Sequence, residues 1–125
     1  MHIVGLDHIV LAVADVERTK AFYERVLGVK AIEQRPGQWA LEVGKNRISL
    51  QKASAMPALA VNTTAGSGNF CLITDTPIAE VADALARQKV EILEGPVRRI
   101  GAAGPIVSVY FRDPDGNLLE VANVV

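Results

Sequence analysis

The sequence has little that would cross-link the chain, charge it strongly or anchor it in a membrane. Its one cysteine, Cys71, excludes an internal disulfide and a zinc site made of several cysteines. A formal net charge of −1 gives no indication of nucleic acid or an acidic membrane as partner. The longest apolar runs, such as residues 9–14, are far too short to span a bilayer. The first residues do not follow the pattern of a secretory signal, so we expect a protein of the reducing cytoplasm.

What the sequence does contain is ordinary for a globular domain. Half of its 125 residues are hydrophobic and 22% are charged, with no low-complexity tract. A chain of this length and composition can bury a sizeable core. We therefore expect one compact domain over residues 1–125.

The first half predicts a strand, a helix and three further strands. Residues 7–13 are mostly apolar and β-branched, which is typical of a well-buried strand. Asp15 is suited to cap a helix over residues 16–26, and Gly28 is suited to end it. Turn residues then separate three predicted strands, at residues 29–34, 38–43 and 47–52.

The second half predicts the same series of elements. A strand over residues 69–74 precedes a helix that ends near Gln88. Asp75 or Thr76 is expected to cap this helix, with Pro77 in its first turn. Three strands are expected afterwards, at residues 90–93, 106–112 and 118–124.

Glycine and proline residues are expected to interrupt the second half at three places. Gly95 and Pro96 should end the strand at residues 90–93. Residues 101–104 are interpreted as a mobile flap, and residues 113–116 as a turn.

The two halves therefore repeat one β-α-β-β-β pattern. A constant offset, increased after a longer loop in the second half, pairs four positions: His8 with Asn69, Trp39 with Tyr110, Asn46 with Asn117, and Ser49 with Glu120. We predict an α+β fold of two βαβββ modules, with module one at residues 1–53, a linker at 54–67 and module two at 68–125. The apolar part of the linker, residues 57–61, is expected to lie on the surface or to contact a partner subunit.

Three segments resemble the vicinal oxygen chelate superfamily. They read LDHIVLAVAD at residues 6–15, AFYERVLG at 21–28 and VYFRDPDGNLLEV at 109–121. The superfamily includes glyoxalase I, extradiol dioxygenases, fosfomycin-resistance thiol transferases, methylmalonyl-CoA epimerases and bleomycin-binding proteins. The resemblance covers nearly the whole chain and implies cup-shaped mixed sheets around a small-molecule site, formed by modules of one chain or of a homodimer.

The resemblance also implies four candidate metal-ligand positions: His8, Ser49, Asn69 and Glu120. His8 and Glu120 are strong ligands, whereas the Asn69 amide is a weak oxygen donor and the Ser49 hydroxyl a weaker one. Gln51 shares the strand face of Ser49 and is an alternative inward-facing donor, and Cys71 shares the strand face of Asn69 and is a softer alternative ligand. The cofactor is then a divalent Mn, Ni, Fe, Zn or Mg ion, or there is none. Without a metal, His8 and Glu120 are candidates for acid–base catalysis.

Other side chains have both a functional and a structural interpretation. Trp39 and Tyr110 are expected either to form two aromatic walls of a substrate pocket or to belong to the core. Asn69 and Gln51 are expected to contact substrate, and Cys71 to be a small buried hydrophobe. Arg98 and Arg99 would either attract an anionic substrate or form a solvated basic pair.

Two functions follow from these residues. The first is a metal-assisted small-molecule enzyme of the glyoxalase or dioxygenase type, a lyase, isomerase or dioxygenase acting on adjacent oxygens, with His8 and Glu120 as catalytic residues. The second is a non-catalytic protein that sequesters a drug-like or aromatic compound, as bleomycin resistance proteins do. The asparagine at position 69, where the resemblance implies a second histidine ligand, favours the second function, and the presence of His8 and Glu120 favours the first.

Overall fold

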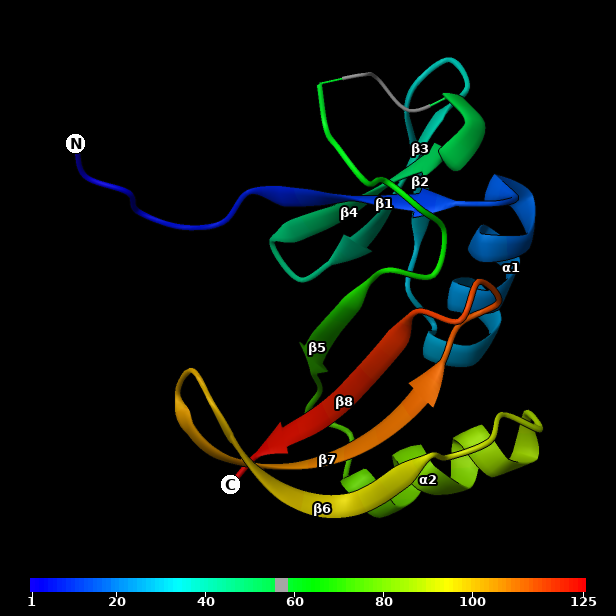
Figure 1. Cartoon of the computed structure of the whole chain (residues 1–125). Coiled ribbons are helices and arrows are strands. Elements are labelled where there is room, and N and C mark those ends of the chain that lie inside the picture. Colours follow the sequence, from blue (N-terminus) through cyan, green and yellow to red (C-terminus); the bar gives the residue numbers. More distant parts are fainter. Residues whose placement is uncertain (56–58) are drawn as a thin grey trace. The chain divides into compact units, whose positions relative to one another are not determined.

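The computed structural model describes residues 1–55 and 59–125, which form two compact units, Met1–Gly66 and Ser67–Val125 (Figure 1). Each unit is a β-α-β-β-β module with a four-stranded mixed sheet. The predicted α+β fold of two βαβββ modules is therefore confirmed. The predicted linker and its apolar part, residues 57–61, lie partly outside the described residues, so these boundaries stay a prediction.

The first unit contains one helix and four strands. They are β1 (His8–Val13), α1 (Val16–Leu27), β2 (Ala31–Arg35), β3 (Gln38–Val43) and β4 (Asn46–Lys52), followed by a short 3-10 turn at Ala53–Ala55. The strand order is β1-β4-β3-β2, with β1 parallel to β4 and the other pairs antiparallel. A parallel pair requires a crossover connection, and α1 begins that connection.

Helix α1 begins and ends where the sequence predicts. The Asp15 side chain accepts a hydrogen bond from the backbone N–H of Arg18, at 3.1 Å. Gly28 adopts a left-handed conformation with φ of 66°, and its N–H donates to the carbonyl of Glu24. The helix buries Thr19 and Tyr23 and contacts strands β3 and β4.

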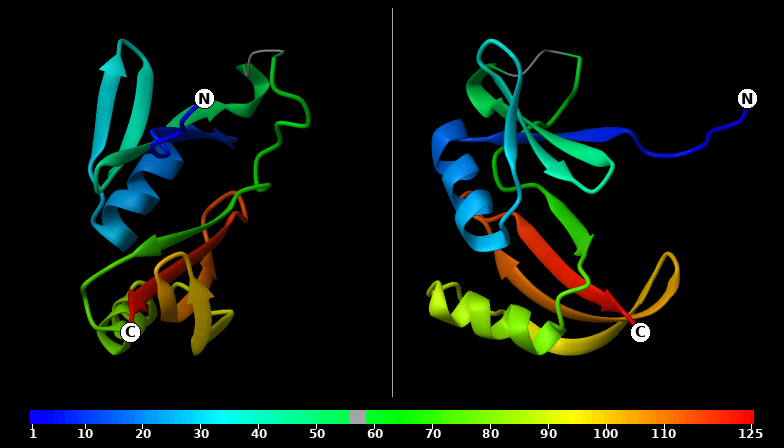
Figure 2. Two further views of the ribbon diagram at one scale, coloured as in Figure 1. Left: turned by 90° about the vertical axis from the view of Figure 1, so that its left-hand side faces the viewer. Right: turned by 180° about the vertical axis from the view of Figure 1, so that it is seen from behind.

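The second unit repeats this arrangement. Its elements are β5 (Asn69–Ile73), α2 (Ile78–Arg87), β6 (Glu94–Gly101), β7 (Gly104–Arg112) and β8 (Leu118–Val124), with strand order β5-β8-β7-β6. Helix α2 contacts β6, β7 and β8 (Figure 2). Its buried Leu85 and the fully buried Val109, Phe111 and Leu119 form the core of this unit.

Strand registers confirm most of the internal repeat but shift one of its pairs. His8 lies opposite Arg47 in the first unit, and Asn69 lies opposite Leu118 in the second. Ser49, however, pairs across β3–β4 with Ala40, whereas Glu120 pairs across β7–β8 with Tyr110. The counterpart of Tyr110 is therefore Ala40, and the predicted equivalence of Trp39 with Tyr110 is wrong by one residue.

Helix α2 begins differently from the prediction. Pro77 occupies the capping position rather than the first helical turn, and neither Asp75 nor Thr76 supplies a capping side chain. Instead, the Asn123 side-chain oxygen in β8 accepts from the N–H of Ile78 at 2.8 Å. The Asn123 amide also donates to the carbonyls of Thr74 and Thr76. A residue distant in sequence thus fixes the start of the helix, which local sequence patterns do not reveal.

The predicted strand at residues 90–93 is wrong. Strand β6 begins at Glu94 and passes through Gly95 and Pro96, with an irregular register between Glu94 and Val97. At Gly95 φ is +110°, and a Cβ atom there would lie 2.3 Å from the backbone oxygen of Ser108. Glycine therefore lets β6 approach β7 closely where it was expected to end the strand.

The predicted mobile flap at residues 101–104 is a hairpin turn. Gly101 and Gly104 pair with each other at the ends of β6 and β7, which leaves Ala102 and Ala103 as the turn residues. Two-residue connections of this kind are tight and join antiparallel strands directly. The turn at residues 113–116 is confirmed.

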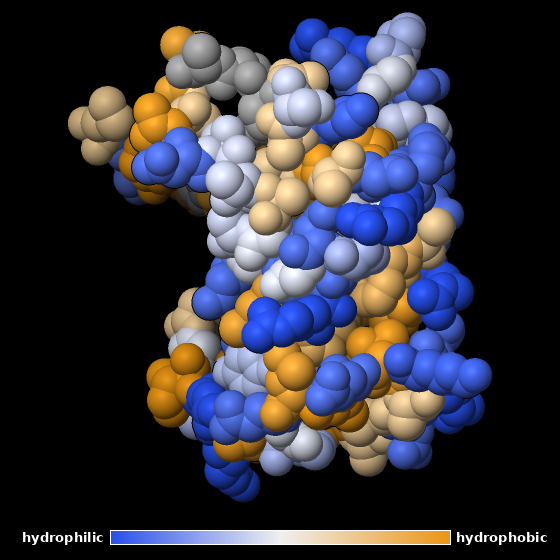
Figure 3. Space-filling model, turned by 45° about the vertical axis from the view of Figure 1, so that its right-hand side comes forward, coloured by the Kyte–Doolittle hydropathy of each residue, from blue (hydrophilic) through white to orange (hydrophobic). Residues whose placement is uncertain are grey.

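The surface mixes hydrophilic and apolar residues over the face seen in Figure 3. Large apolar side chains are exposed at Met1, Ile3, Val4 and Leu6, ahead of β1. Neither α1 nor α2 nor any other helix of the described residues is long and apolar enough to cross a bilayer.

An asparagine ties the start of each module to its last strand. The Asn46 amide donates to the carbonyls of Leu6 and Asp7. Asn117, its counterpart in the repeat, accepts from the N–H of Gly68 at 2.7 Å and donates to Asp113 at 2.8 Å. Asn46 is exposed whereas Asn117 is fully buried, so the second tie carries the larger cost when it is broken.

We predict that Asn117→Ala lowers the free energy of unfolding by about 2–3 kcal/mol, because it removes the acceptor of the part-buried Gly68 N–H and the amide that donates to the buried Asp113 carboxylate. Asn46→Ala is the matched control and should cost less than about 1 kcal/mol, because water replaces its bonds. Urea denaturation followed by circular dichroism measures both values. Equal losses in the two variants would contradict this assignment.

Candidate functional site

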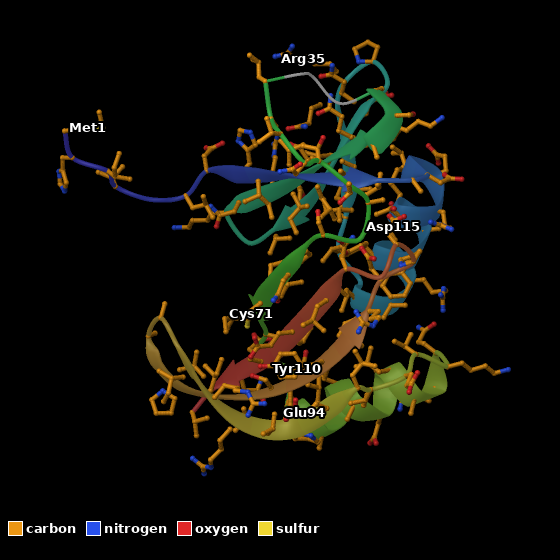
Figure 4. The ribbon with its side chains drawn as sticks, in the orientation of Figure 1. Met1, Arg35, Cys71, Glu94, Tyr110 and Asp115 are labelled. Atoms are coloured by element: carbon orange, nitrogen blue, oxygen red, sulfur yellow. The ribbon has the colours of Figure 1, made fainter. Side chains whose placement is uncertain are left out.

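Four chemically active side chains share the face of the second sheet that α2 does not cover. Successive strand residues point to opposite faces, so Ser108 and Tyr110 project away from the core residues Val109 and Phe111. Glu120 lies directly opposite Tyr110 and Cys71 directly opposite Glu120. Figure 4 shows Cys71 and Tyr110 on β5 and β7, the strands that flank β8. We call Cys71, Ser108, Tyr110 and Glu120 the carboxylate cluster.

Glu120 is the acceptor at the centre of the carboxylate cluster. The Ser108 hydroxyl donates to Glu120 Oε1 at 2.5 Å, and Ser108 is fully buried. The side chains of Tyr110 and Cys71 lie beside Glu120 on neighbouring strands and interact with its carboxylate. The buried Ser108 hydroxyl thus orients a half-buried carboxylate, as proton transfer and ligand binding require.

The same contacts keep the two acidic donors protonated. Desolvation first, and then the charge and hydrogen bond of Glu120, raise the pKa of the Cys71 thiol to about 11. Desolvation and Glu120 also raise the pKa of Tyr110, against a lowering effect of Arg99. Both groups are therefore hydrogen-bond donors at neutral pH, and Cys71 is a poor nucleophile there.

Arg99 extends the cluster toward β6. Its guanidinium carbon lies 5.5 Å from the centroid of the Tyr110 ring, and its Nη2 lies 2.8 Å from Glu94 Oε1. The predicted attraction of an anionic substrate by Arg99 would therefore compete with Glu94. Arg98 is exposed, and its carbonyl accepts from Arg99.

Asn69 lies at the edge of the second sheet. It is exposed at the first position of β5, two residues before Cys71 and so on the same strand face. Its role as a substrate contact or weak metal ligand stays a prediction.

His8 begins β1 in the first unit and is held by its neighbour in sequence. Asp7 Oδ2 lies 2.7 Å from His8 Nδ1, and the His8 side chain is half exposed. This contact leaves Nε2 available, which is how a carboxylate commonly orients a ligating or catalytic histidine. Ser49 accepts a hydrogen bond from Gln34 at 3.3 Å, and Gln51 lies two residues further along the same face of β4.

Trp39 lies on the opposite side of the first sheet. Lys20 Nζ of helix α1 is 3.2 Å from the centroid of the Trp39 ring, so the indole faces the helix. It therefore shares a face with the core residue Leu41 rather than with Ser49. The structure does not support Trp39 as a pocket wall equivalent to Tyr110.

Sequence reasoning missed or misread three members of these sites. Ser108 and Asp7 were not singled out, although Ser108 has the strand parity of Tyr110 and Asp7 precedes the candidate His8 directly. Cys71 was expected to be a buried hydrophobe, but it is exposed and faces Glu120. Cys71 is two residues from Asn69, and this spacing in the sequence already indicated that both side chains lie on the same face of the strand.

A divalent metal fits some of these donors. His8 and Glu120 each have a supporting hydrogen bond of the kind that orients metal ligands. Taken unit by unit, the first contains His8 with the oxygen donors of Ser49 and Gln51, and the second contains Glu120 with that of Asn69; such oxygen donors suit a hard cation. Within residues 1–55 and 59–125, no three His, Cys, Asp or Glu side chains lie together as a ready-made site.

A family model described as the Glyoxalase/Bleomycin resistance protein/Dioxygenase superfamily matches residues 5–121. The chain belongs to this superfamily. The resemblance of its terminal motifs to the vicinal oxygen chelate superfamily is thereby confirmed.

Several superfamily members are similar over nearly the whole chain. Virulence protein STM3117 of Salmonella typhimurium is 43% identical over 121 residues, covering 96% of this chain and 84% of the relative. The structure of an integron cassette protein from the mobile metagenome of V. cholerae has a TM-score of 0.95 at 47% identity, covering 100% and 98% of the two chains. Metallothiol transferase FosB of Lysinibacillus sphaericus is 28% identical, covering 96% and 82%.

The position of Cys71 beside Glu120 predicts how fast the Cys71 thiol is alkylated. Glu120→Gln removes the negative charge that helps to raise the pKa of Cys71, so alkylation by iodoacetamide near pH 8 should become about threefold faster or more. Cys71 is the sole cysteine, so the labelling rate reports on this site alone. Glu94→Gln is the matched control and should leave the rate unchanged. An unchanged rate in Glu120→Gln would argue against the contact.

Proposed function

We propose that the protein is a small-molecule enzyme of the glyoxalase and dioxygenase type, assisted by a divalent metal, in which Glu120 transfers a proton. One observation carries this proposal: a fully buried serine, Ser108, holds the half-buried Glu120 carboxylate in a fixed orientation. A carboxylate that served only solubility would be exposed and would not need a hydrogen bond from a buried serine. The similarity to a protein named as a metallothiol transferase supports the metal.

The residues of the carboxylate cluster have separate roles in this proposal. Glu120 accepts a proton from a carbon or hydroxyl group of the substrate and later returns it. Ser108 positions the carboxylate through its hydroxyl. Tyr110, held in its protonated form, donates to Glu120 and offers an aromatic surface to the substrate.

His8 is the candidate acid–base residue and metal ligand of the first unit. Asp7 holds its Nδ1, so Nε2 can bind a metal or exchange a proton. Asn69, Gln51 and Ser49 would contribute oxygen donors to metal or substrate. When bound, a divalent cation would polarise a substrate oxygen and stabilise the negative charge that develops on it.

A non-catalytic ligand-binding protein is the second candidate. The observation that favours it is the donor set, which contains one strong ligand per unit and otherwise amides and a hydroxyl. Tyr110 would then bind a flat or aromatic compound, and the hydrogen bonds of Glu120 would select it. For either candidate function we propose that the protein is a homodimer located in the cytoplasm.

Metal titration by calorimetry separates the two. Purified protein, stripped of metal, is titrated with Mn²⁺, Ni²⁺, Fe²⁺, Zn²⁺ and Mg²⁺. We expect saturable binding of at least one ion, weakened about tenfold or more in His8→Ala and in Glu120→Gln, because each variant removes a strong ligand.

Two matched variants control this experiment. His2→Ala removes the other histidine, and Glu94→Gln removes a carboxylate outside the carboxylate cluster. Both should bind metal as the wild type does. If the wild type ignores every ion while an aromatic compound quenches its tyrosine fluorescence, and Tyr110→Ala abolishes that quenching, the protein is a binding protein.

A further inference from the structure

A polar cavity of about 380 Å³ lies in the first unit beside His8. Its lining residues are Asp7, His8, Gln34, Lys45 and Arg47. They come from the start of β1, the end of β2 and the β3–β4 hairpin. The cavity involves no residue of the carboxylate cluster.

Strand pairing places Arg47 next to His8. The two residues are direct partners in the parallel β1–β4 ladder. Arg47 is two residues from Ser49, so it shares the face of the sheet away from α1. Asn46 holds the hairpin against the carbonyls of Leu6 and Asp7, which keeps the cations near the start of β1.

The charges of this cavity are unbalanced. Arg47 donates to the neutral amide oxygen of Gln34 at 3.2 Å, and Lys45 has no hydrogen-bond or ion-pair partner among the described residues. The single lining carboxylate, Asp7, is engaged by His8. Glu42 lies opposite Arg47 in the β3–β4 ladder but forms no ion pair with it. Neither cation of the cavity is therefore neutralised by a salt bridge among the described residues, unlike Arg99, which is paired with Glu94.

The internal repeat shows that this charge is not required by the fold. Arg47 corresponds to Leu118 in the second unit, where the partner across the ladder is Asn69. The same backbone geometry therefore forms with an uncharged pair. The fold of a module therefore does not depend on an arginine beside a histidine at these positions.

We propose that this cavity binds an oxyanion, a carboxylate or phosphoryl group, of the small molecule on which the protein acts. The Arg47 guanidinium has the planar donors that match either group, and Lys45 adds a mobile charge. Gln34, which already contacts Arg47, holds the guanidinium in place. Calling the bound molecule a substrate rests on the proposed function, whereas binding of the oxyanion does not.

Nuclear magnetic resonance tests the site with simple probes. Isotope-labelled protein in a constant chloride background is titrated with inorganic phosphate in one arm and with glycolate in the other. We expect saturable shifts of the backbone amides around His8, Lys45 and Arg47. The arm that saturates at lower concentration identifies the preferred group.

Variants make the assignment falsifiable. Arg47→Gln should weaken binding about tenfold, as expected for loss of a charged hydrogen-bonding partner. Arg47→Lys should restore part of the binding. Lys45→Gln lies at an exposed turn and should weaken it about threefold, which keeps a test available if Arg47→Gln fails to fold. Arg98→Gln, an exposed arginine of the second unit, is the matched control and should bind as the wild type does.

Failure of the oxyanion site can be distinguished from failure of the proposed metal-assisted function. Glu120→Gln should bind both probes normally, because Glu120 does not line the cavity. Shifts that do not saturate, or equal effects of Arg47→Gln and Arg98→Gln, would overturn the oxyanion site and leave the proposed role of Glu120 untouched. Normal oxyanion binding together with an absence of metal binding would overturn the metal-assisted function alone.

Discussion

Each module begins and ends with strands that pair in parallel, β1 with β4 and β5 with β8, and this pairing decides which side chains share a surface. Parallel neighbours cannot be joined by a short turn, so a long connection must lie between them, and here it contains a helix and two further strands. The helix contacts one face of the sheet, and the side chains of His8 and Glu120 belong to the other. His8 beside Arg47 and Cys71 beside Glu120 are both products of this constraint.

On the second sheet the pairing produces an arrangement in which polar groups depend on one another. Glu120 accepts a hydrogen bond from Ser108, and desolvation together with the Glu120 charge raises the pKa values of Cys71 and Tyr110. Donors that stay protonated keep their hydrogen bonds to the carboxylate at neutral pH. The members of the cluster are therefore electrostatically coupled, and removing the Glu120 charge changes the pKa values of Cys71 and Tyr110.

Sequence patterns predicted the elements well where the signal was local. Asp15 and Gly28 bound α1 as expected, and β3 and β8 have the predicted limits. The errors arose where a distant residue decides the conformation. Asn123 starts α2 from another strand, and the backbone of Ser108 requires glycine at position 95.

In the candidate site, too, the features set by local sequence were predictable and those set by distant residues were not. Family motifs placed His8 and Glu120 correctly at strand positions, but they carry no information on what holds those side chains. Ser108 became visible only through the β7–β8 register, and a one-residue difference between the two registers moved Trp39 to the helix side. Register depends on bulges and turns, such as those of β6, which composition does not encode.

The repeat keeps the backbone and varies the chemistry, and that contrast separates structural residues from functional ones. Asn46 and Asn117 occupy equivalent positions and perform equivalent backbone ties, so they serve the fold. Arg47 and Leu118, or Ser49 and Glu120, occupy equivalent positions with unrelated chemistry. Because both modules fold with either residue, stability does not explain the charged member of each pair. The first unit therefore carries cations beside a histidine, and the second carries a carboxylate supported by a buried serine.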